Sequence, residues 1–255
     1  MKIVFVGAGN LATRLSLAMQ RVGMQIGQVY SHTEESARQL AVQLGCPWTN
    51  DLSALQADAD LYVFSLKDTA LQEVISKVKS NNGMWIHTAG SMPMSVFEGY
   101  AGRFGVLYPL QTFSKGRNVN FEVIPFFIEA NTEKDADYLK NIASALSENV
   151  RFMSSEKRRS LHLAAVFACN FTNHIYTLSY KLLENESIPA EVLLPLIDET
   201  VAKIHSMSPA AAQTGPAIRY DENVINKHLA MLDDPDMKAI YQLLSQSIHK
   251  EAQNE

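Results

Sequence analysis

Cysteine, charge and long apolar runs are all scarce in this sequence of 255 residues. Its two cysteines, Cys46 and Cys169, lie far apart in the sequence and in apolar surroundings. A free cysteine in such surroundings acts as a small hydrophobic residue, which is typical of a reducing compartment and argues against an oxidising compartment. Charged residues amount to 19% and the net charge is −5, so nothing favours nucleic acid or an anionic membrane as a partner. Apolar runs break well before the ~18 residues that cross a bilayer, and no signal peptide is apparent. We therefore expect a cytoplasmic protein.

The first half does contain a regular alternation of short β-branched or aromatic runs with amphipathic stretches. This pattern is typical of a parallel sheet flanked by helices, and the 47% of apolar residues can form a substantial core. Strands are predicted at 2–6, 25–30, 61–66, 84–87, 104–107, 125–130 and 150–153, with a short piece near 47–48. Helices are predicted at 11–22, 33–44, 68–78 and 132–146. The fold class is therefore α/β, with a doubly wound, mostly parallel Rossmann sheet of seven or eight strands.

The second half contains no convincing strand, and helices are predicted at 156–183, 191–205, 222–232 and 235–252. We place the boundary near residue 153, which gives a Rossmann domain of residues 1–153 and an all-α domain of residues 154–255. The helix at 156–183 carries more apolar surface than one small helical domain can cover. This predicts a homodimer formed through the helical domain.

The glycine-rich run Gly7-Ala8-Gly9-Asn10-Leu11-Ala12 directly follows the first predicted strand and opens the first helix. That is the context of a dinucleotide-binding turn. Gly7 permits the tight turn, Gly9 lets the backbone approach the pyrophosphate, and Ala12 fills the packing position, while N–H groups at the helix start stabilise the phosphate charge. One alternative is a glycine turn without a ligand. Another is an S-adenosylmethionine site, which usually has an acidic residue just before the glycines, and none is present.

The end of the second predicted strand distinguishes NAD from NADP. An NAD site places a carboxylate there, about 20 residues beyond the glycines, to bind the ribose. Here the stretch is Gln28-Val29-Tyr30-Ser31-His32-Thr33, with no carboxylate before Glu34. Small hydroxyls and a potential cation suit a 2′-phosphate, so the predicted cofactor is NADP. Arg38 either contacts this phosphate or pairs with Glu34 on the helix surface.

Three other strand ends are polar or glycine-rich: Ser65-Leu66-Lys67-Asp68, His87-Thr88-Ala89-Gly90-Ser91 and Tyr108-Pro109-Leu110-Gln111-Thr112. Ligands of open α/β sheets lie beyond the carboxyl ends of the strands, so each run can face the nicotinamide ribose. We expect the backbone of Ser65 and Leu66 to line the cofactor and Asp68 to cap the next helix. His87 either contacts the bound ligands or is a satisfied structural residue.

Several segments, in this order, resemble a known family. They are the glycine run, His87-Thr88-Ala89-Gly90, Tyr108 to Phe113, His162 to Asn170, Leu194-Pro195-Leu196-Ile197 and Thr214 to Asp221. Over nearly the whole chain they resemble the bacterial Rossmann-like NADP oxidoreductases with a C-terminal helical domain of unknown function. The resemblance implies an N-terminal domain similar to that of pyrroline-5-carboxylate reductase and of deazaflavin-dependent NADP oxidoreductases. It also implies a helical domain similar to the dimerising domains of the 6-phosphogluconate and β-hydroxyacid dehydrogenase superfamily.

The long predicted helix departs from that superfamily. Its β-hydroxyacid dehydrogenases carry a Lys four residues before an Asn as proton donor. Here Val166 stands four residues before Asn170, and Leu161 stands four residues after Lys157, so the pair is missing. This argues against hydroxyacid dehydrogenase chemistry.

The same helix carries His162, Asn170, Asn173 and His174 instead. On an ideal α-helix His162 and Asn173 point the same way, roughly 16 Å apart, and Asn170 lies about 80° round from His162 and roughly 12 Å along. Histidine suits the role of proton donor, so His162 and Asn170 are the predicted catalytic residues, and Asn173 is predicted to bind substrate. The alternative is that they are polar residues satisfied in an interface. No metal site is predicted, since no carboxylate or second cysteine joins the histidines.

Three arginines of the second half are assigned either to the substrate site or to the solvent-exposed surface. Arg219 either binds an anionic group of the substrate or pairs with Asp221, which we expect to cap the helix that begins at residue 222. Arg158 and Arg159 are expected to be solvated.

The sequence thus predicts an NADPH-dependent reductase of a small carbonyl or imine compound, bound in the cleft between the domains. Because the superfamily's Lys is missing, a sensor that binds NADP(H) without turnover is the alternative. Deazaflavin-dependent reduction of NADP is a third possibility.

Overall fold

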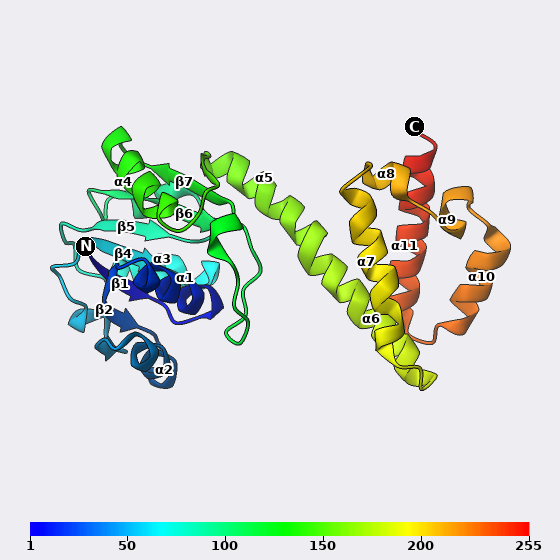
Figure 1. Ribbon diagram of the computed structural model, residues 1–255, viewed down its shortest axis with the longest axis horizontal. Coiled ribbons are helices and arrows are strands. Elements are labelled where there is room, and N and C mark those ends of the chain that lie inside the picture. Colours follow the sequence, from blue (N-terminus) through cyan, green and yellow to red (C-terminus); the bar gives the residue numbers. More distant parts are fainter. Residues whose placement is uncertain (255) are drawn as a thin grey trace. The chain divides into compact units, whose positions relative to one another are not determined.

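The structure is a computed structural model that describes residues 1–254 (Figure 1). Contacts divide the chain into two compact units, Met1–Asn170 and the part from Phe171 onward. The first unit contains every strand among the described residues, and the second is helical.

Eight strands form one sheet in the order β3-β2-β1-β4-β5-β6-β7-β8. Their bounds are β1 (Lys2–Val6), β2 (Gln25–Tyr30), β3 (Trp48–Thr49), β4 (Leu61–Phe64), β5 (Met84–His87), β6 (Phe104–Pro109), β7 (Phe126–Ala130) and β8 (Val150–Phe152). All neighbours are parallel except β6 and β7. The order 3-2-1-4-5-6 is that of a Rossmann sheet, which confirms the predicted α/β, doubly wound, mostly parallel fold.

Helices cover both faces of the sheet, which explains why its central strands are apolar on both sides. Residues of α1 (Asn10–Arg21), α2 (Glu34–Leu44) and α4 (Glu133–Ser144) share one buried cluster with the sheet. On the opposite face, α3 (Asp68–Lys77) and the 3₁₀ turn Met94–Phe97 form a second cluster around Trp85.

The direction of the strands places five segments at one edge. Because β2, β1, β4, β5 and β6 are successively parallel, their carboxyl ends lie side by side. The segments that follow them begin at Ser31, Gly7, Ser65, Thr88 and Leu110. This edge is where an open α/β sheet binds its ligands.

The predicted helix at 156–183 is not one continuous α-helix. It consists of α5 (Ser155–Ala165), a π-helical segment at Val166–Phe171 and α6 (Thr172–Asn185). Leu161 of α5 packs against a small cluster of Val106, Tyr108 and Phe127 on the sheet. The first unit therefore ends at Asn170 and not where the last strand ends, whereas the boundary at 153 marks only the change from strand to helix.

The second unit continues with α7 (Leu194–Ile204), α8 (Pro209–Ala212), α9 (Pro216–Arg219), α10 (Glu222–Met231) and α11 (Pro235–Ala252). Asp221 caps α10 as predicted, since its Oδ1 accepts the backbone N–H of Val224 at 3.3 Å. Asp234 caps α11 in the same way. None of the helices between residues 1 and 254 has the length and hydropathy needed to cross a membrane.

Candidate active site

Gly7 makes the turn after β1, and no other residue fits there. Its φ is +125°, and a Cβ would lie 2.2 Å from the backbone oxygen of Ser65. Its N–H donates to the carbonyl of Tyr30 at 2.8 Å. The turn is thus held between the ends of β2 and β4, the place where Rossmann sheets approach the dinucleotide.

Gly9 is the N-cap of α1, and no side chain caps this helix. A Cβ on Gly9 would meet nothing within 4 Å, so the space beside the helix start is open. Asn10 and Leu11 belong to the first helical turn, whose N–H groups have no intrahelical acceptor, and Ala12 is fully buried at the packing position. An open space beside uncapped amides fits a dinucleotide phosphate.

At the end of β2, Ser31 is half-buried, whereas His32 and Thr33 are exposed. Thr33 occupies the N-cap position of α2, but its side chain makes no capping hydrogen bond. Arg38 does not pair with Glu34, because its guanidinium lies 2.6 Å from the carboxylate of Glu35 instead.

Hydroxyl contacts connect the ends of β4 and β5. Thr88 Oγ1 donates to Ser65 Oγ at 3.2 Å. The prediction that Asp68 caps α3 is wrong: Lys67 occupies the N-cap position, and the Asp68 carboxylate accepts the hydroxyl of Ser91. These two hydrogen bonds connect the segment after β4 to the segment after β5.

His87 is fully buried at the end of β5. Its Nε2 lies 3.3 Å from the carbonyl oxygen of Pro93, and its ring lies beside Phe97. Desolvation, assisted by the charge of Arg158, lowers the pKa of His87 to about 3, so the ring is neutral at neutral pH. The His87 side chain has no exposed surface with which to contact a cofactor. Its environment is that of a structural residue whose hydrogen bonds are satisfied.

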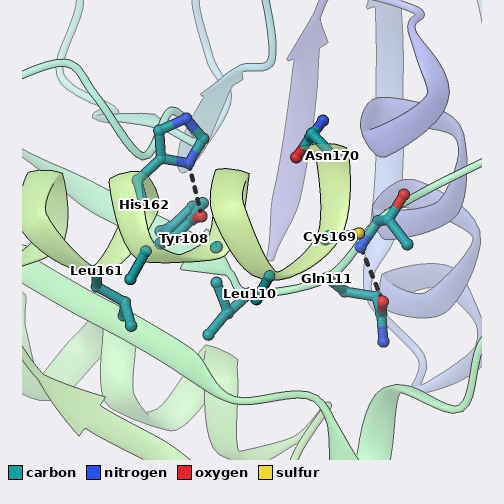
Figure 2. A pocket seen from close by; sticks show the side chains of 11 residues that line it. Tyr108, Leu110, Gln111, Leu161, His162, Cys169 and Asn170 are labelled. Atoms are coloured by element: carbon teal, nitrogen blue, oxygen red, sulfur yellow. Dashed lines mark hydrogen bonds between the residues drawn. The ribbon is translucent and has the colours of Figure 1, made fainter. Parts of the chain in front are cut away.

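A pocket of about 540 Å³ lies within the first unit, between the residues after β6 and the helical segment that leads to Asn170 (Figure 2). Tyr108 and Leu110 to Thr112 form one wall, and His162 and Asn170 belong to the other. Because β6 runs parallel to β5, β4 and β1, the pocket lies at the same edge of the sheet as the glycine turn.

His162 is held in this pocket by two neighbours. The Tyr108 hydroxyl lies 3.0 Å from His162 Nδ1, and the two rings meet edge to face at 6.0 Å (Figure 2). Gly90 packs against the imidazole so closely that a Cβ on it would lie 2.6 Å from Nδ1. Sequence reasoning did not single out Tyr108 or Gly90 as site residues, although both lie in runs that it marked at strand ends.

Asn170 lies in the π-helical segment, and this changes the geometry predicted from an ideal α-helix. A π turn bonds residue i to i+5, so each residue advances by a smaller angle than in an α turn. The offset of Asn170 from His162 is therefore smaller than expected, and both side chains project from the same side of the helix in the view of Figure 2. Asn173 lies beyond the π-helical segment, in the second unit, so its alignment with His162 stays a prediction.

Arg158 is not solvated, contrary to the prediction, whereas Arg159 is exposed. The Arg158 guanidinium is fully buried, with Nη1 2.8 Å from the carboxylate of Glu129 on β7 and Nη2 2.6 Å from the carbonyl of Met92. Ser155 Oγ donates to the same carboxylate at 2.6 Å. This network fixes the start of α5 to the sheet, and so it fixes the helix that carries His162.

The two cysteines differ in environment. Cys46 is half-buried, and desolvation raises the pKa of its thiol to about 11. Cys169 is exposed and lines the pocket, and both cysteines are free thiols in the structure. Among residues 1–254, no three His, Cys, Asp or Glu side chains are grouped so as to hold a metal ion.

The other predicted site residues belong to the second unit. Asn173, His174 and Arg219 are exposed there. Arg219 forms no ion pair within the described part of the chain, and the carboxylate of Asp221 serves the α10 cap. Substrate binding by Asn173 and Arg219 stays a prediction.

Comparison with family models gives one match for each half of the chain. Residues 2–86 match the family described as "NADP oxidoreductase coenzyme F420-dependent", and residues 124–248 match a domain of unknown function, DUF2520. A comparison with curated proteins finds no match.

Solved structures extend the similarity over the whole chain. The chain is 55% identical to a "putative NADP oxidoreductase" from Bacteroides fragilis, with 98% of each chain covered and a TM-score of 0.92. It shares its fold at 14% identity with a 1-pyrroline-5-carboxylate reductase from Streptococcus pyogenes, which covers 100% of this chain and 99% of that one at a TM-score of 0.64. The chain also shares its fold with an imine reductase from Myxococcus stipitatus, solved in complex with NADP⁺. The identity is 14% and the TM-score is 0.64, with 100% of this chain and 93% of the other covered.

The Rossmann sheet, the glycine turn before an uncapped helix and the similarity over almost the full length agree with the resemblance inferred from sequence. The chain belongs to the family of NADP oxidoreductases in which an N-terminal region of the NADP oxidoreductase type is followed by a DUF2520 region.

Proposed function

We propose that the protein is an NADPH-dependent reductase of a small carbonyl or imine compound. The observation that carries the proposal is that the pocket containing His162 lies at the same edge of one sheet as the glycine turn. A cofactor on that turn would extend along the edge past β4 and β5, because dinucleotides span the crevice where the strand order reverses. The nicotinamide would then lie near the His162 pocket.

Residues of this chain hold the cofactor and complete the reaction. Gly7, Gly9 and the N–H groups of Asn10 and Leu11 bind the pyrophosphate. When bound, NADPH supplies a hydride to the carbon of the substrate's C=O or C=N bond. His162 donates a proton to the oxygen or nitrogen that becomes negative, and Asn170 orients the substrate by hydrogen bonds.

NADPH is favoured over NADH by the residues at the end of β2. Ser31, His32 and Thr33 offer hydroxyls and a potential cation, and no carboxylate is present to repel a 2′-phosphate. The hydroxyl of Thr33 is not engaged in capping α2. Among the relatives, the imine reductase was solved with NADP⁺, which supports the same choice.

A substrate panel tests the proposal. Ketoacids, aldehydes and cyclic imines are offered to the full-length protein with NADPH and then with NADH, and cofactor oxidation is followed by absorbance. We expect turnover of at least one carbonyl or imine class, with NADPH oxidised faster than NADH at equal concentration. If NADPH binds but no compound is reduced, the protein is a sensor of NADP(H), and a preference for NADH would contradict the assignment of the 2′-phosphate site.

The helical unit supports a homodimer as the working form. Among the described residues from Phe171 onward, only three apolar residues are buried: Ala217, Ile225 and Leu232. Many others are exposed, among them Leu182, Val192, Leu196, Ile204 and Leu243. Exposed apolar surface on this scale is typical of a subunit interface. Sedimentation equilibrium is expected to give twice the chain mass of 28.4 kDa, and a monomer at micromolar concentration would refute the dimer.

A further inference from the structure

We propose that Tyr108 is a positioning residue that acts through His162. Together with Gly90 it holds the imidazole so that Nδ1 is committed to the Tyr108 hydroxyl and Nε2 is the only ring nitrogen left for the substrate. The kinetic part of this inference rests on the proposed function, in which the proton passes through His162. The geometric part does not.

The hydroxyl of Tyr108 is itself fixed in place. Tyr108 lies on β6, only 8% of its surface is exposed, and its ring packs against Phe127 of β7 at 6.5 Å. The hydroxyl therefore reaches His162 Nδ1, at 3.0 Å, from a rigid strand rather than from a loop. An anchor on a strand restricts the rotation of the imidazole more than a mobile partner would.

Gly90 closes the second side of the ring. A Cβ at this position would lie 2.6 Å from both Cγ and Nδ1 of His162 and 2.9 Å from its Cβ. The imidazole thus packs directly on the backbone of the segment after β5. With Tyr108 bonded at one nitrogen and Gly90 against the ring, Nε2 points away from both.

A tyrosine hydroxyl suits this role because it can donate and accept. It donates to Nδ1 of the neutral ring, which leaves the hydrogen on Nε2, and it accepts from Nδ1–H when the ring is protonated. Burial raises the pKa of Tyr108, so the hydroxyl keeps its own hydrogen at neutral pH. The ring can therefore change protonation state without changing its orientation.

Polar and ionisable groups on the elements around the pair are engaged with other partners within the described chain. On α5 itself, Arg158 is paired with Glu129. Beside Gly90, Ser91 is bonded to Asp68. From β5, His87 is neutral and bonded to Pro93. Among the described residues, the Tyr108 hydroxyl is the side-chain group found within hydrogen-bond distance of the His162 ring.

The ¹⁵N resonances of the His162 ring test the geometry without substrate or cofactor. At a pH where the ring is neutral, Tyr108→Phe is expected to move the Nδ1 resonance downfield, toward that of an acceptor nitrogen without a hydrogen bond. Phenylalanine keeps the packing against Phe127, so the fold is expected to survive. Tyr138→Phe, which removes a hydroxyl whose partner is Met1, is the matched control and is expected to leave the resonance in place. An unchanged Nδ1 resonance in Tyr108→Phe would overturn the proposal.

Kinetics on a confirmed substrate give a second measurement. Tyr108→Phe is expected to lower kcat about tenfold with KM unchanged, because it removes one hydrogen bond that orients the His162 ring. Gly90→Ala, which displaces the ring, is expected to lower kcat further. A rise in KM alone would refute the positioning role. If no substrate is ever found, the proposed function fails, but the resonance measurement still decides the geometry.

Discussion

Alanine in place of His162 is expected to lower kcat by about 100-fold or more, since a positioned general acid contributes typically 10²–10⁴-fold. The Kd of NADPH is expected to stay the same. His162 belongs to the helical wall of the pocket, whereas the predicted cofactor contacts lie on the turn after β1 and at the neighbouring strand ends. Stopped-flow or steady-state assays give kcat, and fluorescence titration of NADPH gives Kd.

Two control variants separate chemistry from structure. His162→Gln has a side chain of similar reach that can still hydrogen-bond to Tyr108 but has no titrating ring nitrogen, so it is expected to be as slow as the alanine variant. His205→Ala removes an exposed histidine at the end of α7 and is expected to retain the wild-type rate. Full activity of His162→Ala on a confirmed substrate would exclude His162 as proton donor.

Gly9→Ala is expected to weaken NADPH binding by about 100-fold, or about 2.7 kcal/mol, without changing the melting temperature. In the free protein a Cβ at Gly9 meets nothing within 4 Å, so the fold tolerates it. The same Cβ would occupy the space through which the pyrophosphate approaches the backbone. Binding is measured by isothermal titration and stability by thermal denaturation.

Gly7→Ala is expected to behave differently, because its Cβ would lie 2.2 Å from the Ser65 carbonyl oxygen at a φ of +125°. We expect it to lose NADPH binding and also to lower the melting temperature by roughly 5–10 °C. Gly102→Ala, where a Cβ also meets nothing within 4 Å, is the control for the substitution itself. Wild-type affinity in Gly9→Ala would show that the turn is not the phosphate site.

The parts of the fold that depend on local pattern could be predicted from the sequence. The bounds of β1, β2, β5 and α11 match the predictions, because their apolar periodicity and flanking glycines, prolines and caps are local signals. The position of the glycine turn follows from the same signals. The antiparallel pairing of β6 and β7 does not, because strand direction depends on how the chain crosses the sheet and not on side-chain pattern.

The candidate site was predicted only in part, because its contacts are long-range. His162 and its bonded partner Tyr108 are 54 residues apart in the chain, and Arg158 and Glu129 are 29 apart. Arg158 follows Lys157 and precedes Arg159, so nothing in its neighbours distinguishes a buried cation from a solvated one. Asp68 was assigned to a cap because Asp commonly caps helices, but the hydroxyl of Ser91 competes for its carboxylate.

The π-helical segment at Val166–Phe171 has a consequence for chain length. A turn closed by i→i+5 bonds contains one residue more than a turn closed by i→i+4 bonds. Relative to an uninterrupted α-helix the segment is therefore a one-residue insertion, and deleting a residue such as Ala168 would let the ordinary ladder close. Such a deletion would place Asn170 seven residues after His162, about two α turns along, so its side chain would stay on the same side of the helix. A relative with a gap of one residue at this point would therefore present the same amide beside its histidine from an ordinary α-helix.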